Sequence, residues 1–362
     1  MALKDTIGIG IIGTGFARTT QIPAFRACAD ARIVAIASAH RANAERVARE
    51  FDIDYFTDDW RALVARDDVD LVSIVTPPVT HLEMTLASLN AGKAVLCEKP
   101  MAMNSVETEA MRKRAIETGT LALIDHEMRF LPGRRMMREM LINGEIGRVY
   151  HAKLGFRADS RADVTRGWDW WSDKEAGGGA LGAIGSHAVD AFRWLLGTEV
   201  ARVFCHLATH VGQRADKQSG ETKTVTTDDE ANLTLQFADS ELTDGATGAI
   251  SLSVVESGRP EHRLEIFGSS GALMLDADKL WRARTGMGEW QAVGVEKENV
   301  AAGVSDSDWS RAFKTYSRAI VDALLVGATT VEGAATFHDG HQTQVVLDAA
   351  RQSNKTGCIV SL

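Results

Sequence analysis

Two glycines near the N-terminus are spaced to hold a phosphate group. Residues 8–16 read Gly-Ile-Gly-Ile-Ile-Gly-Thr-Gly-Phe, so an apolar run ends in Gly13-Thr14-Gly15. Gly13 would permit a sharp turn, and Gly15 would let the backbone approach a pyrophosphate at the N-terminus of the following helix. Arg18 stands where the usual fingerprint has its third glycine. The motif predicts a dinucleotide site, with a plain tight turn as the alternative.

The end of the next apolar run bears on which dinucleotide would bind. This run, residues 32–37, is followed by Ser38 and, three residues later, by Arg41. A carboxylate at the position of Ser38 would accept the adenosine ribose hydroxyls and repel a 2′-phosphate. A hydroxyl beside a cation suits a 2′-phosphate, so we predict NADP, with NAD as the alternative. The competing interpretation is that Arg41 is a solvated cation at the start of a helix.

The apolar runs also predict the elements that position these residues. The first 125 residues alternate continuous apolar strands with helical segments, which is typical of a parallel sheet covered on both faces. We therefore expect a Rossmann domain over residues 1–125. Residues 126–362 contain long polar–apolar alternating runs, which predict an α/β domain with a large, mostly antiparallel open sheet. We expect residues 212–224 to form a loop, and late helices at 308–325 and 339–353.

Composition excludes several classes of protein. Of the 362 residues, 45% are hydrophobic and 25% are charged, which excludes a disordered chain, a collagen and a coiled coil. The net charge of −9 argues against nucleic acid as a partner. No apolar stretch reaches the roughly 18 residues that a membrane span needs. The four cysteines are scattered and no secretory signal is evident, so we expect free thiols and a cytoplasmic location.

Two other chemistries find little support. His206 and His210, and also His338 and His341, are closely spaced, but neither pair has a third ligand at a telling distance. We therefore predict no metal. A serine hydrolase would need a Gly-x-Ser-x-Gly elbow, which the chain lacks.

Several further motifs occur in an order that is typical of one enzyme family. Glu98-Lys99-Pro100 follows a predicted strand, and His187 follows a glycine run at 177–179. Together with the glycine turn, they resemble the glucose–fructose oxidoreductase and inositol dehydrogenase family, called Gfo/Idh/MocA. The matching pieces are Gly10–Gly15, Thr76-Pro77 with His81, Ala91–Lys93, Glu98–Pro100, Arg129-Phe130, Gly177–Leu181 and Gly185–Asp190, and more weakly 225–229, 264–275 and 337–340.

This resemblance implies a pyridine-nucleotide oxidoreductase that interconverts a hydroxyl and a keto group on a sugar, a polyol or a related small molecule. It also implies a homodimer or homotetramer. The implied cofactor contacts are Gly13, Thr14, Gly15, Phe16, Ala17, Ser38, Arg41, Thr76, Pro77, His81, Glu98 and Lys99.

The resemblance assigns the catalytic roles to Lys99 and His187. The Lys99 ammonium would polarise the reacting oxygen, and the proline after it resembles the family's cis-proline. His187 would move the proton near neutral pH. Substrate contacts are expected from both residues, from Arg129 and from Trp170, whose ring can stack on a sugar. The alternative interpretations are purely structural. Lys99 would then be a surface lysine, His187 a buried histidine at a helix start, and Trp170 a ring that packs against the sheet.

Two departures from the family pattern stand out. Ala183 occupies the position where the family usually carries an aspartate, four residues before His187, and Glu127 replaces a usual asparagine. Another acid, such as Asp173, Asp190 or Glu127, would then have to assist, or Lys99 and His187 would suffice alone. Two rival functions stay open: an NADP-binding sensor or regulatory protein without catalysis, and an enzyme that uses tightly bound NAD transiently in glycoside cleavage or epimerisation.

Overall fold

The computed structural model describes residues 4–216 and 219–362, and the chain divides into two compact units. The first unit contains the chain up to Leu131 together with Glu298–His341, and the second contains Pro132–Lys297 and Gln342–Leu362. This division differs from the predicted boundary at residue 125. Residues 298–341, which we expected in the second domain, pack with the first because the apolar face of their helix covers the Rossmann core.

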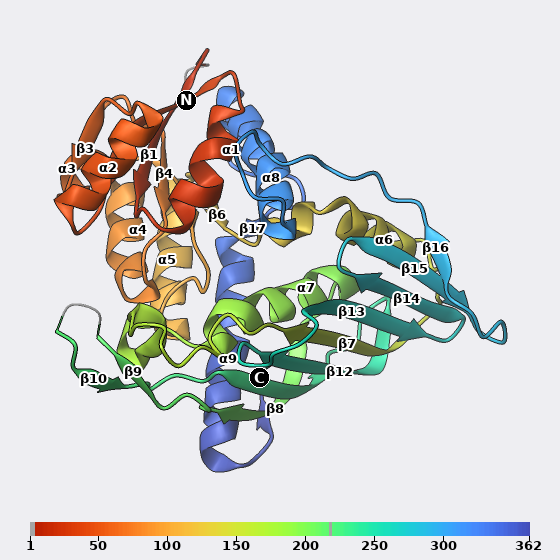
Figure 1. Cartoon of the computed structure of the whole chain (residues 1–362). Helices are drawn as coiled ribbons and strands as arrows, with labels where there is room; N and C mark the ends of the chain where they lie inside the picture. Colours follow the sequence, from red (N-terminus) through yellow and green to blue (C-terminus); the bar gives the residue numbers. More distant parts are fainter. Residues whose placement is uncertain (1–3, 217–218) are drawn as a thin grey trace. The chain divides into compact units, whose positions relative to one another are not determined.

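The first unit is built on a seven-stranded sheet in the order β17-β6-β5-β4-β1-β2-β3 (Figure 1). Strands β1 to β6 are parallel, and their order is that of the doubly wound dinucleotide-binding fold. Only β17 runs antiparallel to its neighbour, β6. The strands are β1 (Ile7–Ile12), β2 (Ala31–Ala37), β3 (Tyr55–Thr57), β4 (Leu71–Ile74), β5 (Ala94–Cys97), β6 (Ala122–Ile124) and β17 (Ala335–Thr336).

Helices cover both faces of this sheet, which confirms the predicted Rossmann architecture. Successive strand residues alternate between two apolar cores, as Ile11 and Ile12 of β1 show. Helices α1, α2 and α8 contribute to one core, and α3, α4 and α5 contribute to the other. The helical elements are η1 (Ala17–Gln21), α1 (Ile22–Arg26), α2 (Arg41–Phe51), α3 (Trp60–Val64), η2 (Pro78–Thr80), α4 (His81–Asn90), α5 (Ser105–Thr118), η3 (Glu127–Phe130) and α8 (Asp308–Leu325).

The second unit contains a nine-stranded sheet in the order β16-β15-β14-β13-β7-β12-β11-β8-β18. All neighbours are antiparallel except β7 and β12, so the predicted open, mostly antiparallel sheet is confirmed. Its strands are β7 (Val149–Arg157), β8 (Val200–Ala208), β11 (Glu230–Phe237), β12 (Thr243–Ser253), β13 (Glu261–Gly268), β14 (Gly271–Asp276), β15 (Lys279–Arg284), β16 (Gln291–Val293) and β18 (Val360–Ser361).

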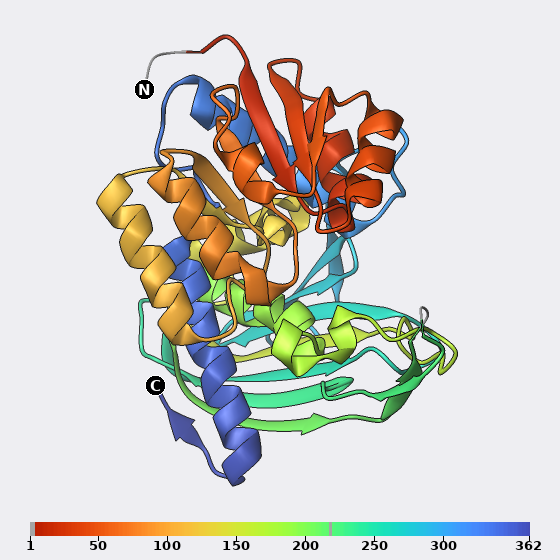
Figure 2. The same cartoon turned by 90° about the vertical axis from the view of Figure 1, so that its left-hand side faces the viewer.

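Helices pack against one face of this sheet (Figure 2). Met137, Phe192 and Leu347 bring α6, α7 and α9 into one apolar core with the strands. The opposite face leaves the large side chain of Phe204 exposed, because its neighbours Val203 and Cys205 point into the core. The helical elements are α6 (Pro132–Ile142), η4 (Trp170–Ser172), η5 (Lys174–Ala176), η6 (Leu181–Gly185), α7 (Ser186–Leu196) and α9 (Phe337–Thr356), of which α9 begins in the first unit.

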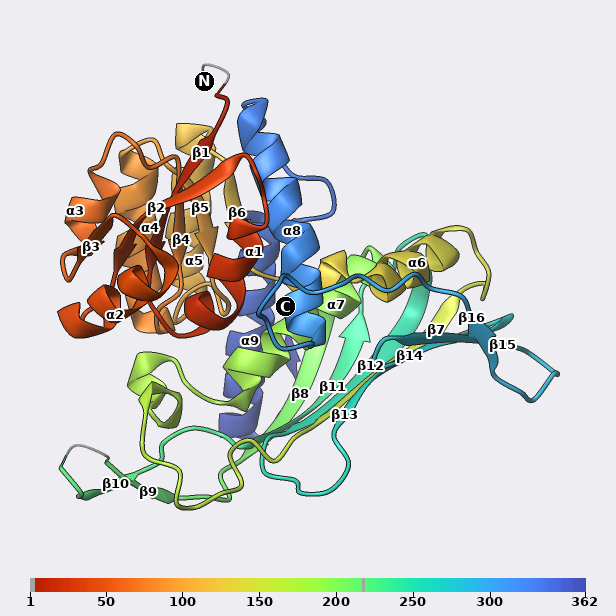
Figure 3. The same cartoon turned by 45° about the horizontal axis from the view of Figure 1, so that its top comes forward.

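The stretch 212–224 is a hairpin rather than the predicted loop. Strands β9 (Gln213–Ala215) and β10 (Thr222–Thr224) pair in antiparallel register, and the hairpin stands apart from the large sheet (Figure 3). Its polar composition hid the strands, because the residue that β9 buries is Arg214 and the segment therefore lacks apolar alternation. Residues 217–218 lie outside the described residues.

Two smaller findings complete the fold. All four cysteines are free thiols, as predicted, and three of them are buried. Within residues 4–216 and 219–362, no helix is both long and apolar enough to cross a membrane.

Candidate active site

The glycine turn after β1 has the backbone that a dinucleotide needs. Gly13 has φ +112°, and a Cβ placed on it would lie 2.0 Å from the carbonyl oxygen of Val75, so only glycine fits there. Gly15 is different, because a Cβ on it would meet nothing within 4 Å. Gly13 therefore serves the turn, and Gly15 keeps open backbone surface of the kind that a pyrophosphate approaches.

The helix after this turn explains how Arg18 replaces the third glycine. Phe16 precedes the π-helix η1, in which Ala17 is fully buried and can pack against the sheet. The Arg18 side chain points outward, and its Nε donates to Oε2 of Glu50 at 2.6 Å. The position therefore needs no glycine.

Ser38 and Arg41, which are predicted to contact the adenosine ribose, lie beside the end of β3. The N–H of Ser38 donates to the carbonyl of Thr57. The guanidinium of Arg41 lies 3.7 Å from Asp58 and 5.0 Å from the ring centre of Phe56. Arg41 is exposed, so a ligand at this turn can reach it.

Three further predicted cofactor residues, Thr76, Pro77 and His81, lie at one hydrogen-bonded corner of the first unit. His81 is fully buried at the start of α4, with Nε2 2.8 Å from the carbonyl oxygen of Thr76. Its Nδ1 lies 3.1 Å from the carbonyl oxygen of Pro100, and burial lowers the pKa of His81. Pro77 lies in the same turn, immediately before η2. His81 thus ties the loop after β4 to the loop after β5, which is a structural role within this corner.

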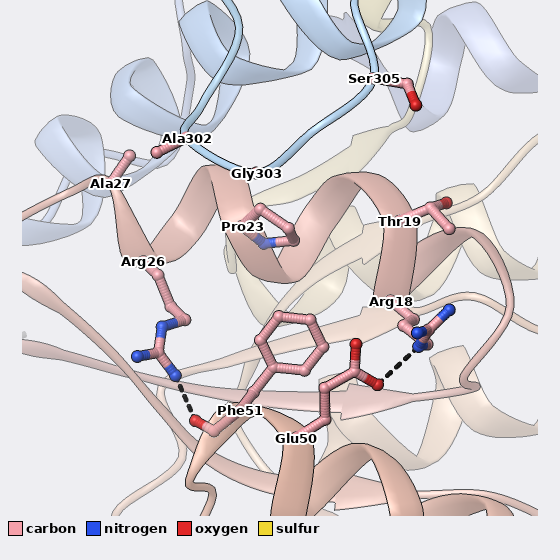
Figure 4. A pocket seen from close by; sticks show the side chains of 10 residues that line it. All are labelled: Arg18, Thr19, Pro23, Arg26, Ala27, Glu50, Phe51, Ala302, Gly303 and Ser305. Atoms are coloured by element: carbon pink, nitrogen blue, oxygen red, sulfur yellow. Dashed lines mark hydrogen bonds and ion pairs between the residues drawn. The ribbon is translucent and has the colours of Figure 1, made fainter.

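One pocket of the first unit lies apart from this corner. It has a volume of about 460 Å³, and Figure 4 shows Arg18 and Arg26 at its wall. Both arginines are engaged, Arg18 with Glu50 and Arg26 with the carbonyl of Phe51. Of the predicted cofactor residues, none lines it, so it is not the predicted cofactor cradle. It is lined by Arg18, Thr19, Pro23, Arg26, Ala27, Glu50, Phe51, Ala302, Gly303 and Ser305.

Lys99 lies two residues after β5, at the edge of the sheet where a Rossmann fold binds its ligands. The Lys99–Pro100 peptide bond is cis, as the motif implied. Nζ of Lys99 lies 4.0 Å from Oε2 of Glu98, whose side chain is buried. The lysine head is therefore next to a buried carboxyl group rather than on the open surface.

A buried polar network joins this carboxyl to three residues that the motifs did not single out. Nε2 of Gln21 donates to Oε1 of Glu98 at 3.1 Å and to Oδ2 of Asp125 at 2.9 Å. The hydroxyl of Ser73 donates to Oε1 of Gln21 at 2.6 Å. Asp125 comes directly after β6, so its position at a strand end was the one sequence signal that could have found it.

Arg129, a predicted substrate contact, makes buried interactions within the first unit. Its guanidinium lies 3.1 Å from Oδ1 of Asp339 and 3.4 Å from the carbonyl oxygen of Ala334. Burial alone would raise the pKa of Asp339, but Arg129 and the bonds from Thr336 hold it at about 2. These contacts are structural, and the substrate role of Arg129 stays a prediction.

In the second unit, His187 lies in the first turn of α7 and is 4% exposed. The π-helix η6 leads into α7, and the N–H of Leu181 donates to Oδ2 of Asp228 at 2.6 Å. A Cβ on Gly179 would lie 2.5 Å from Oδ1 of Asp228, and one on Gly178 would lie 2.1 Å from the carbonyl oxygen of Trp171. The glycine run therefore lets this helix start approach its supports closely.

The acids considered as replacements at Ala183 lie in different surroundings. Asp173 caps η5 by accepting from the N–H of Glu175 at 3.0 Å. Asp190 is buried on α7, three residues after His187, a spacing that places two side chains on one helix face. Glu127 is buried in η3 of the first unit. Across the described ranges, no group of three or more His, Cys, Asp or Glu side chains is arranged to hold a metal.

The tryptophan-rich loop of the second unit is held by a buried arginine. Arg161 binds Asp169 through both terminal nitrogens, at 2.9 and 2.7 Å, and lies over the ring of Trp171. Trp170 is 40% exposed. The loop thus presents one exposed indole ring, and its contact with a sugar stays a prediction.

Family models match both parts of the chain. The model described as an oxidoreductase family with an NAD-binding Rossmann fold matches residues 7–126, and the model of the GFO/IDH/MocA C-terminal domain matches residues 135–274. An uncharacterized oxidoreductase of Synechocystis sp. is 33% identical over 77% of this chain and 74% of its own length. Levoglucosan dehydrogenase of Pseudarthrobacter phenanthrenivorans is 28% identical over 76% of this chain and 75% of its own.

Solved structures agree along the whole chain. An oxidoreductase domain protein from Kribbella flavida has a TM-score of 0.88 at 28% identity, covering 99% of both chains. Levoglucosan dehydrogenase in complex with NADH and L-sorbose has a TM-score of 0.88 at 25% identity, again covering 99% of both chains. The fold of the first unit and the similarity to these proteins thus define an NAD-binding oxidoreductase. The chain belongs to the Gfo/Idh/MocA family, as its motifs indicated.

Proposed function

We propose that this oxidoreductase interconverts a hydroxyl and a keto group on a sugar, a polyol or a related small molecule. The observation that carries the proposal is the placement of Gly15 and Lys99 at the carboxyl ends of β1 and β5 in one parallel sheet. In this fold, that edge binds both the cofactor and the reacting group. Levoglucosan dehydrogenase and the D-glucoside 3-dehydrogenase of Escherichia coli, which is 32% identical over 65% of this chain and 68% of its own length, favour a carbohydrate-like substrate.

Lys99 and His187 have different roles at the substrate oxygen. A bound nicotinamide supplies or accepts the hydride. The Lys99 ammonium binds the substrate oxygen and stabilises the negative charge that develops on it. His187 takes the hydroxyl proton during oxidation and returns it during reduction, for which an imidazole is suited near neutral pH. Arg129 and Trp170 complete the proposed substrate contacts.

We propose NADP as the preferred cofactor. The open turn at Gly15 fits the pyrophosphate, and Ser38 leaves no carboxylate at the end of β2 to repel a 2′-phosphate. Arg41 is exposed beside it. In the variant Arg41→Ala, NADPH binding should weaken about tenfold while NADH binding is unchanged. The matched control is Arg49→Ala on the same helix, and equal weakening of both cofactors would remove the basis for NADP.

Turnover distinguishes the proposed enzyme from its rivals. Purified protein is mixed with NADPH and a panel of keto-sugars, and the nicotinamide absorbance is followed. Consumption of many equivalents of NADPH is the expected result. Binding without turnover across the panel would favour the sensor, for which Ala183 is the supporting observation. A nucleotide that co-purifies and never exchanges would favour transient oxidation by a resident NAD.

We further propose a homodimer or homotetramer, formed through the exposed face of the nine-stranded sheet. Tyr150 of β7 and Phe204 of β8 are 60% and 40% exposed on this sheet. Association would remove this apolar surface from water. Sedimentation should show a multiple of the chain mass, and Phe204→Lys should shift it toward the single chain.

A further inference from the structure

A single buried amide holds two carboxyl groups next to Lys99. Both hydrogens of the Gln21 Nε2 amide are used, one toward Glu98 and one toward Asp125. The two carboxyl oxygens therefore lie less than two hydrogen-bond lengths from each other. Gln21, Ser73 and Asp125 are fully buried, and Glu98 is 8% exposed. Water is thus excluded from most of this cluster.

The charge on this cluster is unfavourable if every acid is ionised. Glu98 and Asp125 face each other, Glu127 of η3 adds a third negative charge toward Asp125, and Lys99 is the cation that acts on both carboxyls. Two carboxylates that share a site cannot both ionise easily, because like charges repel strongly in a dry environment. Burial raises the pKa of Glu98, and burial with the charges of Glu127 and Glu98 raises that of Asp125 well above its usual range.

Further polar side chains lie around the pair. The Cys97 thiol of β5 has its pKa raised by burial and also by both carboxyls. Burial of His81 of α4 lowers its pKa and the Lys99 charge lowers it further, whereas the carbonyl groups that face its ring act in the opposite direction. From α8, the Tyr316 hydroxyl donates to the carbonyl of Ile124, one residue before Asp125.

We propose that Glu98 and Asp125 share one proton across the Gln21 amide, and that Asp125 is thereby a positioning residue for Lys99. With the proton in place, the pair carries one negative charge, and the Lys99 ammonium remains available to the substrate oxygen. When the proton is lost, a second carboxylate competes for the ammonium and draws it away. The pair then sets the alkaline limit of activity.

This inference rests on the proposed role of Lys99, but its first test does not need activity. In infrared spectra of the wild-type protein at neutral pH, a protonated carboxyl group gives a carbonyl band that disappears in alkali. We expect this band to shift when aspartate or glutamate is labelled with ¹³C, and to be absent in Asp125→Asn. The control Asp68→Asn changes an exposed carboxyl of the same unit and should leave the band in place. Absence of the band in the wild type, or its survival in Asp125→Asn, would overturn the proposal.

The second test is the pH profile of kcat and KM. Asparagine mimics a protonated aspartic acid, so Asp125→Asn should keep kcat within about fivefold at neutral pH, the worth of one neutral hydrogen bond. Its alkaline limb should move to higher pH, whereas Asp68→Asn leaves the limb unchanged. Asp125→Leu leaves one of the two Gln21 amide hydrogens without its acceptor and should lower kcat about tenfold or more.

The outcomes separate this inference from the proposed function. An unshifted alkaline limb in an active Asp125→Asn enzyme contradicts the shared proton and leaves the oxidoreductase intact. Full activity of Lys99→Ala contradicts the proposed function, while the infrared test still decides where the proton is. If Asp125→Asn fails to fold, Glu98→Gln replaces it in the infrared test and should abolish the same band.

Discussion

The two units hold their candidate catalytic residues by different means. In the first unit, Lys99 lies two residues after a buried strand, so the hydrogen bonds of a parallel sheet fix the chain that leads to it. In the second unit, His187 lies at a helix start that depends on Asp228, more than forty positions away in the chain, and on close approaches at Gly178 and Gly179. A residue held by a sheet can be placed from its own sequence neighbourhood, whereas a residue held by distant side chains cannot.

The largest effect on kcat is expected from substitution of Lys99, which lies after a strand of the parallel sheet. Lys99→Ala removes the cation that stabilises charge on the substrate oxygen, so kcat should fall at least about 100-fold. Steady-state kinetics with a substrate found by the panel measures it. Lys93→Ala, which changes a lysine of the same unit that donates to the carbonyl of Arg66, serves as the control. Retained activity in Lys99→Ala would mean that the active site is misplaced.

Substitutions of Gly13 and Gly15 should affect two different properties, the stability of the fold and the binding of the cofactor. Gly13→Ala places a Cβ against the Val75 carbonyl at positive φ, so the free energy of unfolding should fall by about 3 kcal/mol. Gly15→Ala meets open space and should leave stability unchanged while weakening nucleotide binding. Chemical denaturation and nucleotide titration measure the two effects. A stable Gly13→Ala, or unchanged binding in Gly15→Ala, would contradict the roles assigned to these glycines.

The ion pair of Asp339 and Arg129 predicts how the first unit responds to acid. The pKa of Asp339 is lowered to about 2, so its contribution is present above the unfolded pKa and is lost as pH falls from about 4 toward 2. Asp339→Asn should therefore lose about 2 kcal/mol of stability at neutral pH and less in acid. Urea unfolding at several pH values measures this difference. A loss that stays constant with pH would contradict it.

A helix cap in each unit sharpens the comparison further. Asp228→Ala removes the acceptor for the Leu181 N–H, and Asp59→Ala removes the acceptor for the Arg61 N–H at the start of α3. Each should cost about 1 kcal/mol of stability. Only Asp228→Ala should also lower kcat, because it loosens the helix start that carries His187. Equal effects of the two variants on kcat would show that this support is not needed for catalysis.

The sequence predicted the elements well where the signal was local. The helix at 308–325 has the expected bounds, because its cap and its apolar face lie within the segment itself. Its placement with the first unit was missed, because a helix's sequence does not say which core its apolar face covers. The hairpin at 213–224 was missed because its strands are polar and lack the apolar alternation that marks a buried sheet.

The residues of the candidate site also fall into two groups, those that the sequence could indicate and those that it could not. Gly13, Gly15 and Lys99 could be proposed from the sequence because motifs at strand ends carry their own chemistry, and their roles stay predictions. The shared hydrogen-bond network of Gln21, Ser73 and Asp125 could not be, because it joins side chains from three separate elements and each looks ordinary in its own segment.

The central proposal is that Lys99 and His187 serve one reaction. The most direct test is a double-mutant cycle with Lys99→Ala, His187→Ala and the combined variant, measured as kcat/KM. Groups that act on the same transition state are strongly non-additive. We predict that the double variant is scarcely worse than the poorer single variant. Effects that multiply independently, or a His187→Ala enzyme with full activity, would contradict the claim.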